Sequence, residues 1–182
     1  MVARRTESVE SGSPDLEGLN PESPMITLDV VGADDWERWR DMRLNALAEA
    51  PEAFCSSLSD WEHQSERAWR DRLTNVSANV IAVLEGEDAG MVSAEVSDHD
   101  VELIGMWVAP FARGRGVGDE LVRAVINWSF SRQGSRLTLR VLSGNDRAAT
   151  LYLRHGFKFQ SDDGTEPERL MAYTGSRTST YN

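Results

Sequence analysis

Apolar residues recur along the first third of the chain at the three- and four-residue spacing that is typical of helices. This pattern predicts one helix from residue 33 or 34 to Pro51 and a second from about Ser59 to Leu73, the latter with Trp61 and Trp69 as core contacts. A β-rich run at Met25–Val31 precedes them and predicts a first strand. The apolar face of the first helix is formed by Trp36, Trp39, Leu44 and Leu47.

The middle of the chain changes to the shorter period of strands. Val80–Leu84, Met91–Val96 and Val101–Val108 are rich in β-branched residues, and turn-forming residues separate them at Gly86-Glu-Asp and Ser97-Asp-His-Asp. Such runs joined by short turns predict two successive hairpins.

The second half of the chain alternates between helical and strand periodicity. Residues 116–132 carry a broad apolar stripe that predicts a helix packed against a sheet. The remaining predicted elements are a strand at Leu137–Leu142, a short helix from an Asn145 cap to His155, and strands at 157–161 and 168–174. The order predicts a mixed α+β domain with a strand–helix–strand unit at its centre.

Both ends of the chain lack this periodicity. Residues 1–24 are rich in Ser, Glu, Pro and Gly and predict a disordered tail, while residues 175–182 predict a flexible end. The first residues start like a signal peptide, but no apolar segment follows them. We therefore expect one folded domain at residues 25–174.

Charge narrows the classes of partner. The 182-residue chain has a formal net charge of −11, which argues against a nucleic-acid binder and against binding to anionic lipid. A cationic acceptor such as an amine is compatible with it. No nucleic-acid or membrane partner is expected.

The cysteine and histidine content predicts neither a disulfide within the chain nor a metal site. Cys55 is the only cysteine, so no intramolecular disulfide forms, and this fits a reducing cytoplasm, where we expect the protein. His63, His99 and His155 are scattered without ligand spacing, so no metal site is expected.

The glycine-rich run Arg113-Gly-Arg-Gly-Val-Gly118 follows a predicted strand and leads into a predicted helix. Free N–H groups at such a helix start bind phosphate or pyrophosphate. The run is not a P-loop, because Asp119 follows where Lys and Ser or Thr are needed. It is not a dinucleotide fingerprint either, since counting from Gly114 places Asp119 at the final glycine position.

Two motifs in this order resemble the GCN5-related N-acetyltransferase (GNAT) superfamily over about residues 25–174. The acyl-CoA signature Arg/Gln-x-x-Gly-x-Gly/Ala is matched by Arg113, Gly116 and Gly118, with Val108-Ala-Pro110 upstream. The downstream Asn and helix with a terminal Gly-Phe are matched by Asn145, Ala149, Tyr152, Gly156 and Phe157.

The resemblance implies the GNAT fold, a central, mostly antiparallel sheet of six to seven strands flanked by about four helices. It implies acetyl-CoA as co-substrate, with no metal, and leaves a homodimer open. The residues it assigns to acyl-CoA binding are Met106, Trp107, Val108, Arg113, Gly114, Arg115, Gly116, Val117, Gly118, Asn145 and Tyr152.

The resemblance also suggests catalytic roles. Tyr152 is the predicted general acid, because a phenol and a departing thiolate have similar proton affinity. Glu102 is the predicted general base, on the expectation that it shares a strand face with Met106 and Val108. Glu95, Asp98 and His99 are alternates through water.

The expected function is transfer of an acetyl group from acetyl-CoA directly to a primary amine in a ternary complex. A covalent acetyl-Cys55 route is not favoured, because no histidine partner is identifiable. The alternative is a module of the same fold that binds acyl-CoA without turnover. The sequence does not select the acceptor amine.

Overall fold

The computed structural model describes residues 24–98, 100–132, 136–160 and 166–175. The predicted tails at 1–24 and 175–182 lie outside these residues, apart from residues 24 and 175.

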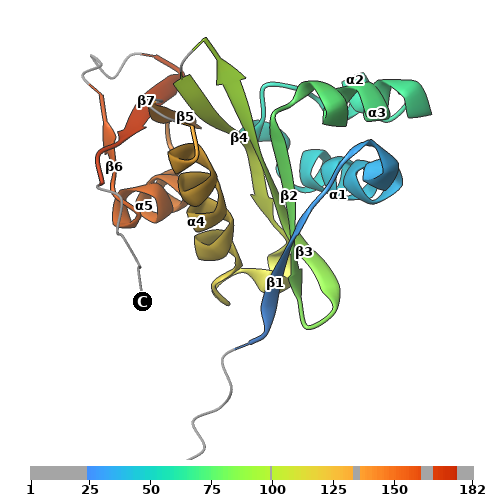
Figure 1. Ribbon diagram of the computed structural model, residues 1–182, viewed down its shortest axis with the longest axis horizontal. Coiled ribbons are helices and arrows are strands. Elements are labelled where there is room, and N and C mark those ends of the chain that lie inside the picture. Colours follow the sequence, from blue (N-terminus) through green and yellow to red (C-terminus); the bar gives the residue numbers. More distant parts are fainter. Residues whose placement is uncertain (1–23, 99, 133–135, 161–165, 176–182) are drawn as a thin grey trace, which may run out of the picture.

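A mixed sheet of seven strands, counted over the described residues, runs through the molecule in the order β1-β2-β3-β4-β5-β7-β6 (Figure 1). Neighbouring strands are antiparallel except for β4 and β5, which are parallel. The strands are β1 (Ile26–Val30), β2 (Ala78–Leu84), β3 (Glu87–Ser97), β4 (Asp100–Val108), β5 (Leu137–Leu142), β6 (Phe157–Phe159) and β7 (Glu168–Tyr173). The predicted α+β fold class is therefore confirmed.

Helices cover both faces of the sheet. α4 and α5 lie on one face, and α1, α2 and α3 lie on the other (Figure 1). Short 3-10 turns at Ala33–Asp35, Pro51–Ala53 and Pro110–Ala112 join several of these elements. The helices are α1 (Trp36–Glu49), α2 (Leu58–Trp61), α3 (Glu66–Asn75), α4 (Val117–Phe130) and α5 (Asp146–Arg154).

Each face of the sheet carries its own core, because alternate strand residues point to opposite sides. The core under α4 includes Leu121 and Val125 with the strand residues that face them. The core under α1 and α3 includes Trp39 and Trp69, each 1% exposed, as well as Ile81. Burying each large side chain contributes about 1.5–3 kcal/mol, so both helical layers are firmly held to the sheet.

The predicted second helix is two helices. α2 ends at Trp61, and α3 begins after Ser65, whose side chain accepts a hydrogen bond from the Ala68 amide at 3.3 Å. Ser57 caps α2 in the same region, with its amide donating to Asp60 Oδ2 at 2.7 Å. Two serine caps within ten residues start two helices, so the prediction of a continuous helix was wrong. Trp61 still packs against Trp69, with ring centroids 4.8 Å apart and ring planes tilted by 43°.

A bulge in β4 reverses the expected side-chain alternation. The pairing of β3 with β4 shifts between Met91 and Ser93, and Gly105 in β4 has a φ of +61°. The extra residue turns the strand, so Leu103 and Met106 contact the same core although they are three residues apart. Glu102 therefore lies on the opposite face from Met106, and the expectation that they share a face was wrong.

The parallel strands β4 and β5 part soon after they meet. Their paired residues run only from Val101 with Leu137 to Leu103 with Leu139. Beyond Leu103 the edge of β4 facing β5 has no ladder partner among the described residues. This opening exposes backbone N–H and C=O groups over Ile104–Val108, in the middle of the sheet.

Candidate functional site

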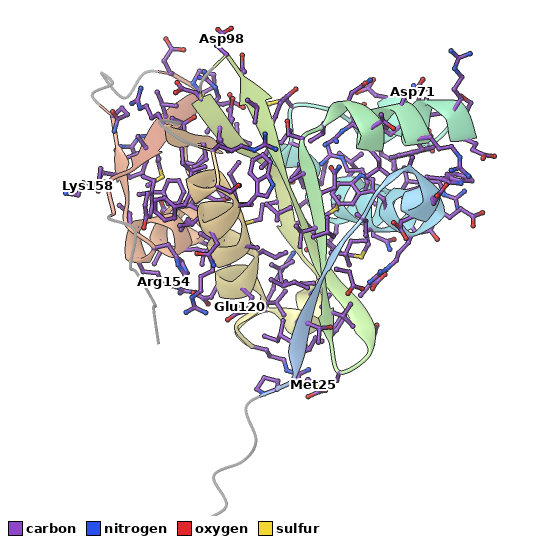
Figure 2. The ribbon with its side chains drawn as sticks, viewed as in Figure 1. Met25, Asp71, Asp98, Glu120, Arg154 and Lys158 are labelled. Atoms are coloured by element: carbon purple, nitrogen blue, oxygen red, sulfur yellow. The ribbon has the colours of Figure 1, made fainter. Side chains whose placement is uncertain are left out.

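A groove of about 1370 Å³ lies where β4 and β5 part. Its walls come from the end of β4, the start of α4, one side of α5 and the end of α1. In Figure 2, Glu120 and Arg154 mark the α4–α5 side of this region, while Asp98 marks the far end of the sheet. Predicted cofactor residues that line it are Met106, Trp107, Val108, Arg113, Gly114, Gly116, Gly118, Asn145 and Tyr152.

The start of α4 forms one end of the groove. Gly116 precedes the helix with a φ of +90°, a left-handed conformation that suits glycine. The first amides of the helix have no carbonyl partner within it, and the helix dipole adds positive potential. A Cβ on Gly118 would lie 3.2 Å from Leu151 Cδ2 and 3.6 Å from Met106 Cε, so glycine keeps the floor open. This end suits a pyrophosphate.

Arginines add positive charge around the same end. Arg113, Arg147 and Arg154 all line the groove of a protein whose net charge is −11. Arg113 Nη2 contacts Glu49 Oε2 at 2.5 Å, and its Nε donates to the Val108 carbonyl at 3.0 Å. The donor set of glycine amides and guanidinium groups fits a phosphate-bearing cofactor such as coenzyme A.

Two predicted cofactor residues do not line the groove. Arg115 Nη2 instead contacts Glu85 Oε1 at 2.6 Å, on the turn between β2 and β3. The Val117 side chain is fully buried in the core under α4. The prediction of side-chain contact by Arg115 has no support in its position, and Val117 offers only its backbone amide.

Tyr152 points from α5 toward β4. The side chain is 7% exposed, and its hydroxyl donates to Met106 Sδ at 3.6 Å. Its ring packs edge-on against Phe157, with centroids 5.9 Å apart. Burial raises the pKa of the phenol above its usual range, so the hydroxyl is protonated at neutral pH. A protonated phenol beside the exposed edge of β4 can donate a proton there, and its raised pKa makes it a weaker acid than the free phenol considered from the sequence.

Asn145 caps α5 as predicted. Its Oδ1 accepts a hydrogen bond from the Ala148 amide at 3.1 Å, and the residue lines the groove. Its capping role is confirmed, and its contact with acyl-CoA stays a prediction.

Glu102 lies outside the groove, on the sheet face that α1 covers. It faces Glu95 across the β3–β4 pair, and its Oε1 is 3.5 Å from Arg140 Nε. Of the alternates, Asp98 is exposed at the tip of the hairpin, and His99 lies outside the described residues. The structure gathers none of the predicted bases around Tyr152, so the role of Glu102 stays a prediction.

Cys55 is exposed, and its thiol contacts Glu168 Oε1 at 2.9 Å. This hydrogen bond, with burial second, raises the pKa of the thiol. A thiol held protonated is a poor nucleophile, which argues against a covalent acetyl-cysteine intermediate.

Sequence reasoning missed several residues of the groove. Glu49, at the end of α1, accepts hydrogen bonds from Arg113 and from Trp107 Nε1, the latter at 3.0 Å, and the Arg113 bond is the main cause that lowers the pKa of Glu49. No sequence motif marks Glu49. Arg147 and Arg154 are seven residues apart on α5, a spacing that places them on one helix face and could have indicated them.

Other classes of site are not seen in the part of the chain that the structure describes. There, no group of three or more His, Cys, Asp or Glu residues is arranged to hold a metal ion. Within the same residues no helix combines the length and apolarity needed to cross a membrane.

Comparison with known proteins agrees with this geometry. The family model "Acetyltransferase (GNAT) family" matches residues 37–157. An N-acetyltransferase 9-like protein of Caenorhabditis briggsae is 25% identical over 134 residues, covering 66% of this chain and 68% of that protein. A mycothiol acetyltransferase of Acidothermus cellulolyticus is 27% identical over 155 residues, covering 79% of this chain and 47% of that protein. This chain thus spans less than half of that relative.

The fold has close neighbours among solved structures. The PaiA N-acetyltransferase of Thermoplasma acidophilum, solved in complex with coenzyme A, superposes with a TM-score of 0.66 at 15% identity, covering 83% of this chain and 99% of that one. This likeness is one of fold. The family match over residues 37–157 shows that the chain belongs to the GNAT family of acetyltransferases.

Proposed function

We propose that the protein transfers the acetyl group of acetyl-CoA directly to a primary amine while both substrates are bound. The observation that carries this proposal is the groove itself. It brings together a helix start that suits a pyrophosphate, an exposed strand edge and a protonated tyrosine.

The donor is held mainly by backbone. Free amides at the start of α4 bind the pyrophosphate, with Arg113 and the α5 arginines adding charge-assisted contacts. The unpaired edge of Met106–Val108 offers N–H and C=O groups to the amide-bearing arm of coenzyme A, as a neighbouring strand would. Asn145 borders the same channel. These contacts set the thioester against β4.

The chemistry then needs one bond made and one broken. The lone pair of the neutral amine attacks the thioester carbonyl carbon, and backbone N–H groups of β4 stabilise the developing oxyanion. As the C–S bond breaks, the leaving sulfur takes the proton of the Tyr152 hydroxyl, which is well placed beside Met106. The attacking nitrogen loses a proton to a base. Tyr152 then regains a proton from solvent.

The base is assigned to Glu102, with water as relay. The bulge at Gly105 leaves this carboxylate on the sheet face opposite α4, so this role requires the amine to approach β4 from that face. Glu95, its cross-strand neighbour, is the nearest alternate. The cytoplasm is the expected location, because the donor is a metabolite of that compartment.

Two measurements test the proposal. Millimolar acetyl-CoA should raise the melting temperature, because a ligand that binds only the folded state stabilises it. Free-thiol release should then appear on addition of amines from a panel of amino acids, polyamines and peptides. Absence of any thermal shift contradicts the proposal, and a shift without thiol release from any amine supports the alternative of an acyl-CoA sensor.

A further inference from the structure

The sheet face opposite α4 carries a cation without a matching anion. Arg43 lies on α1, half-buried, between Phe54 and the bulge of β4. Its guanidinium stacks on the Phe54 ring at 4.5 Å, and its Nη2 donates to Ser56 Oγ at 3.0 Å. Among the described residues no carboxylate lies within ion-pair distance of it.

The other charged side chains near Arg43 have polar partners of their own. Arg140 is 3.5 Å from Glu102, and Glu168 accepts the hydrogen bond of the Cys55 thiol. Arg72 on α3 donates to Asn79 Oδ1 at 3.2 Å and to Ser93 Oγ at 3.3 Å. Arg72 is also half-buried with no carboxylate within ion-pair distance among the described residues, but two hydrogen bonds hold its guanidinium to Asn79 and Ser93, whereas Arg43 has one, to Ser56.

Keeping the guanidinium of Arg43 half-buried without a carboxylate partner costs free energy. Burial, with repulsion from Arg72 second, lowers the pKa of Arg43 to about 10. A charge removed from water without an ionic partner is unfavourable, and a carboxylate bound beside it would offset that cost. Arg43 donates one of its five N–H groups to Ser56, which leaves the planar fork for an oxyanion.

The position of Arg43 connects it to the reaction. Its Nη1 lies 3.7 Å from where a Cβ would stand on Gly105. Gly105 is the residue at which β4 bulges, two positions after its last pairing with β5. The guanidinium is therefore close to the point where the strands part, on the face of the sheet opposite α4.

We propose that the acceptor is an amino acid or a similarly short amine that bears a carboxylate, and that Arg43 binds this carboxylate while the amine faces β4. This inference rests on the proposed acetyltransferase function. A carboxylate placed there neutralises Arg43 and offsets its repulsion from Arg72, whereas a polyamine adds positive charge beside two arginines. The overall negative charge of the protein is thus a poor guide to its acceptor.

The test compares each acid with its own amide. Initial rates of thiol release are measured with the standard L-amino acids, β-alanine and 4-aminobutyrate, each paired with the corresponding carboxamide. At least one acid should exceed its amide by about 10- to 100-fold in kcat/KM, the range for a charge-assisted bidentate contact. Amides that equal or exceed their acids throughout, or a complete lack of turnover with the acids, overturn the inference.

Variants assign the preference to Arg43. Arg43→Met should bring the acid-to-amide ratio close to one, and Arg43→Lys should restore part of it. A purely structural role, such as anchoring Ser56, would lower both rates together and leave the ratio intact, and that result overturns the assignment. Arg67→Met is the matched control, because the Arg67 side chain is 90% exposed on α3.

The experiments distinguish failure of the acetyltransferase proposal from failure of the role given to Arg43. If acetyl-CoA does not stabilise the protein, the acetyltransferase proposal and this inference both fail. If amines without an acidic group are acetylated as well as their acid counterparts, the function stands and only the role of Arg43 falls. The wild-type ratio alone decides the acceptor class should Arg43→Met not fold.

Discussion

The two sides of the β4 opening are built in different ways. On the proposed donor side, formed by α4, α5 and the end of β4, the groove offers glycine amides, a strand edge and three arginines. On the proposed acceptor side, formed by α1, residues 50–57 and the opposite face of the sheet, side chains from distant segments meet, as Cys55 and Glu168 do, and Arg43 bonds Ser56 nearby. Backbone recognition suits a donor shared across a family, while side chains adapt to an individual acceptor.

The largest expected effect is a loss of kcat on substitution of Tyr152, which lies where the proposed donor and acceptor sides meet. Tyr152→Phe should lower kcat by about 100- to 1000-fold, because it removes the proton donor while keeping the ring against Phe157. Binding of acetyl-CoA, measured by calorimetry, should change by less than about twofold, since the contact is needed in the transition state.

Tyr173→Phe is the control for this change. Tyr173 also packs edge-on against Phe157, with centroids 5.5 Å apart, but it does not line the groove. An unchanged kcat in Tyr152→Phe, or an equal loss in Tyr173→Phe, would remove Tyr152 as the acid.

The next effect tests the donor side alone. Gly118→Val should weaken acetyl-CoA binding by about 100-fold, because its first added carbon already meets Leu151 at 3.2 Å and the two methyl groups enter the groove. Gly32→Val is the control, since Gly32 has an extended φ of −126° and open space around it. Equal affinities in both variants would place the cofactor elsewhere.

A smaller effect separates the two arginines of the loop. Arg113→Gln should weaken acetyl-CoA binding by about tenfold, the scale of one charge-assisted contact. Arg115→Gln should change it by less than about twofold, because Arg115 is bound to Glu85 outside the groove. The reverse order, measured by calorimetry at one ionic strength, would contradict the assigned positions.

The smallest effect concerns how α5 is held to α4. Burial raises the pKa of the Asp119 carboxyl, but hydrogen bonds from Arg154 and His155 outweigh it, so the net pKa is lowered. A lowered folded-state pKa stabilises the protein above the unfolded value of about 3.9 and loses this contribution as the pH falls through the folded value.

Asp119→Asn should therefore reduce the free energy of unfolding by about 1 kcal/mol near neutral pH, and the difference from wild type should shrink below about pH 4. Urea unfolding at several pH values measures this. Asp71→Asn, at an exposed i,i+4 pair with Arg67, should differ by less than about 0.5 kcal/mol. A difference between wild type and Asp119→Asn that does not vary with pH would mean that the carboxylate charge plays no part.

The features of the donor side could largely be predicted from the sequence, whereas those of the acceptor side could not. The α+β order, the Arg113–Gly118 loop and the Asn145 cap all depend on local patterns, and local patterns are visible in one sequence. The groove contacts of Arg113 and Gly118 could be anticipated because the loop geometry places them at a helix start.

The rest depends on contacts that no local pattern encodes. The bulge at Gly105 moved Glu102 to the other face, because one extra residue in a strand reverses every side chain beyond it. Glu49 meets Arg113 from 64 positions away, and Cys55 meets Glu168 from 113 positions away. Arg43 becomes noticeable only when its surroundings are known to lack an acid, which is a property of the folded chain.

The central claim is that donor and acceptor occupy the two sides of β4 at the same time. Initial rates of thiol release, measured over a grid of acetyl-CoA and the amine that gives the fastest turnover, test it most directly. Direct transfer in a ternary complex predicts reciprocal plots that intersect, with Cys55→Ala retaining the same pattern. Parallel plots, together with an acetylated enzyme formed without amine, would contradict direct transfer.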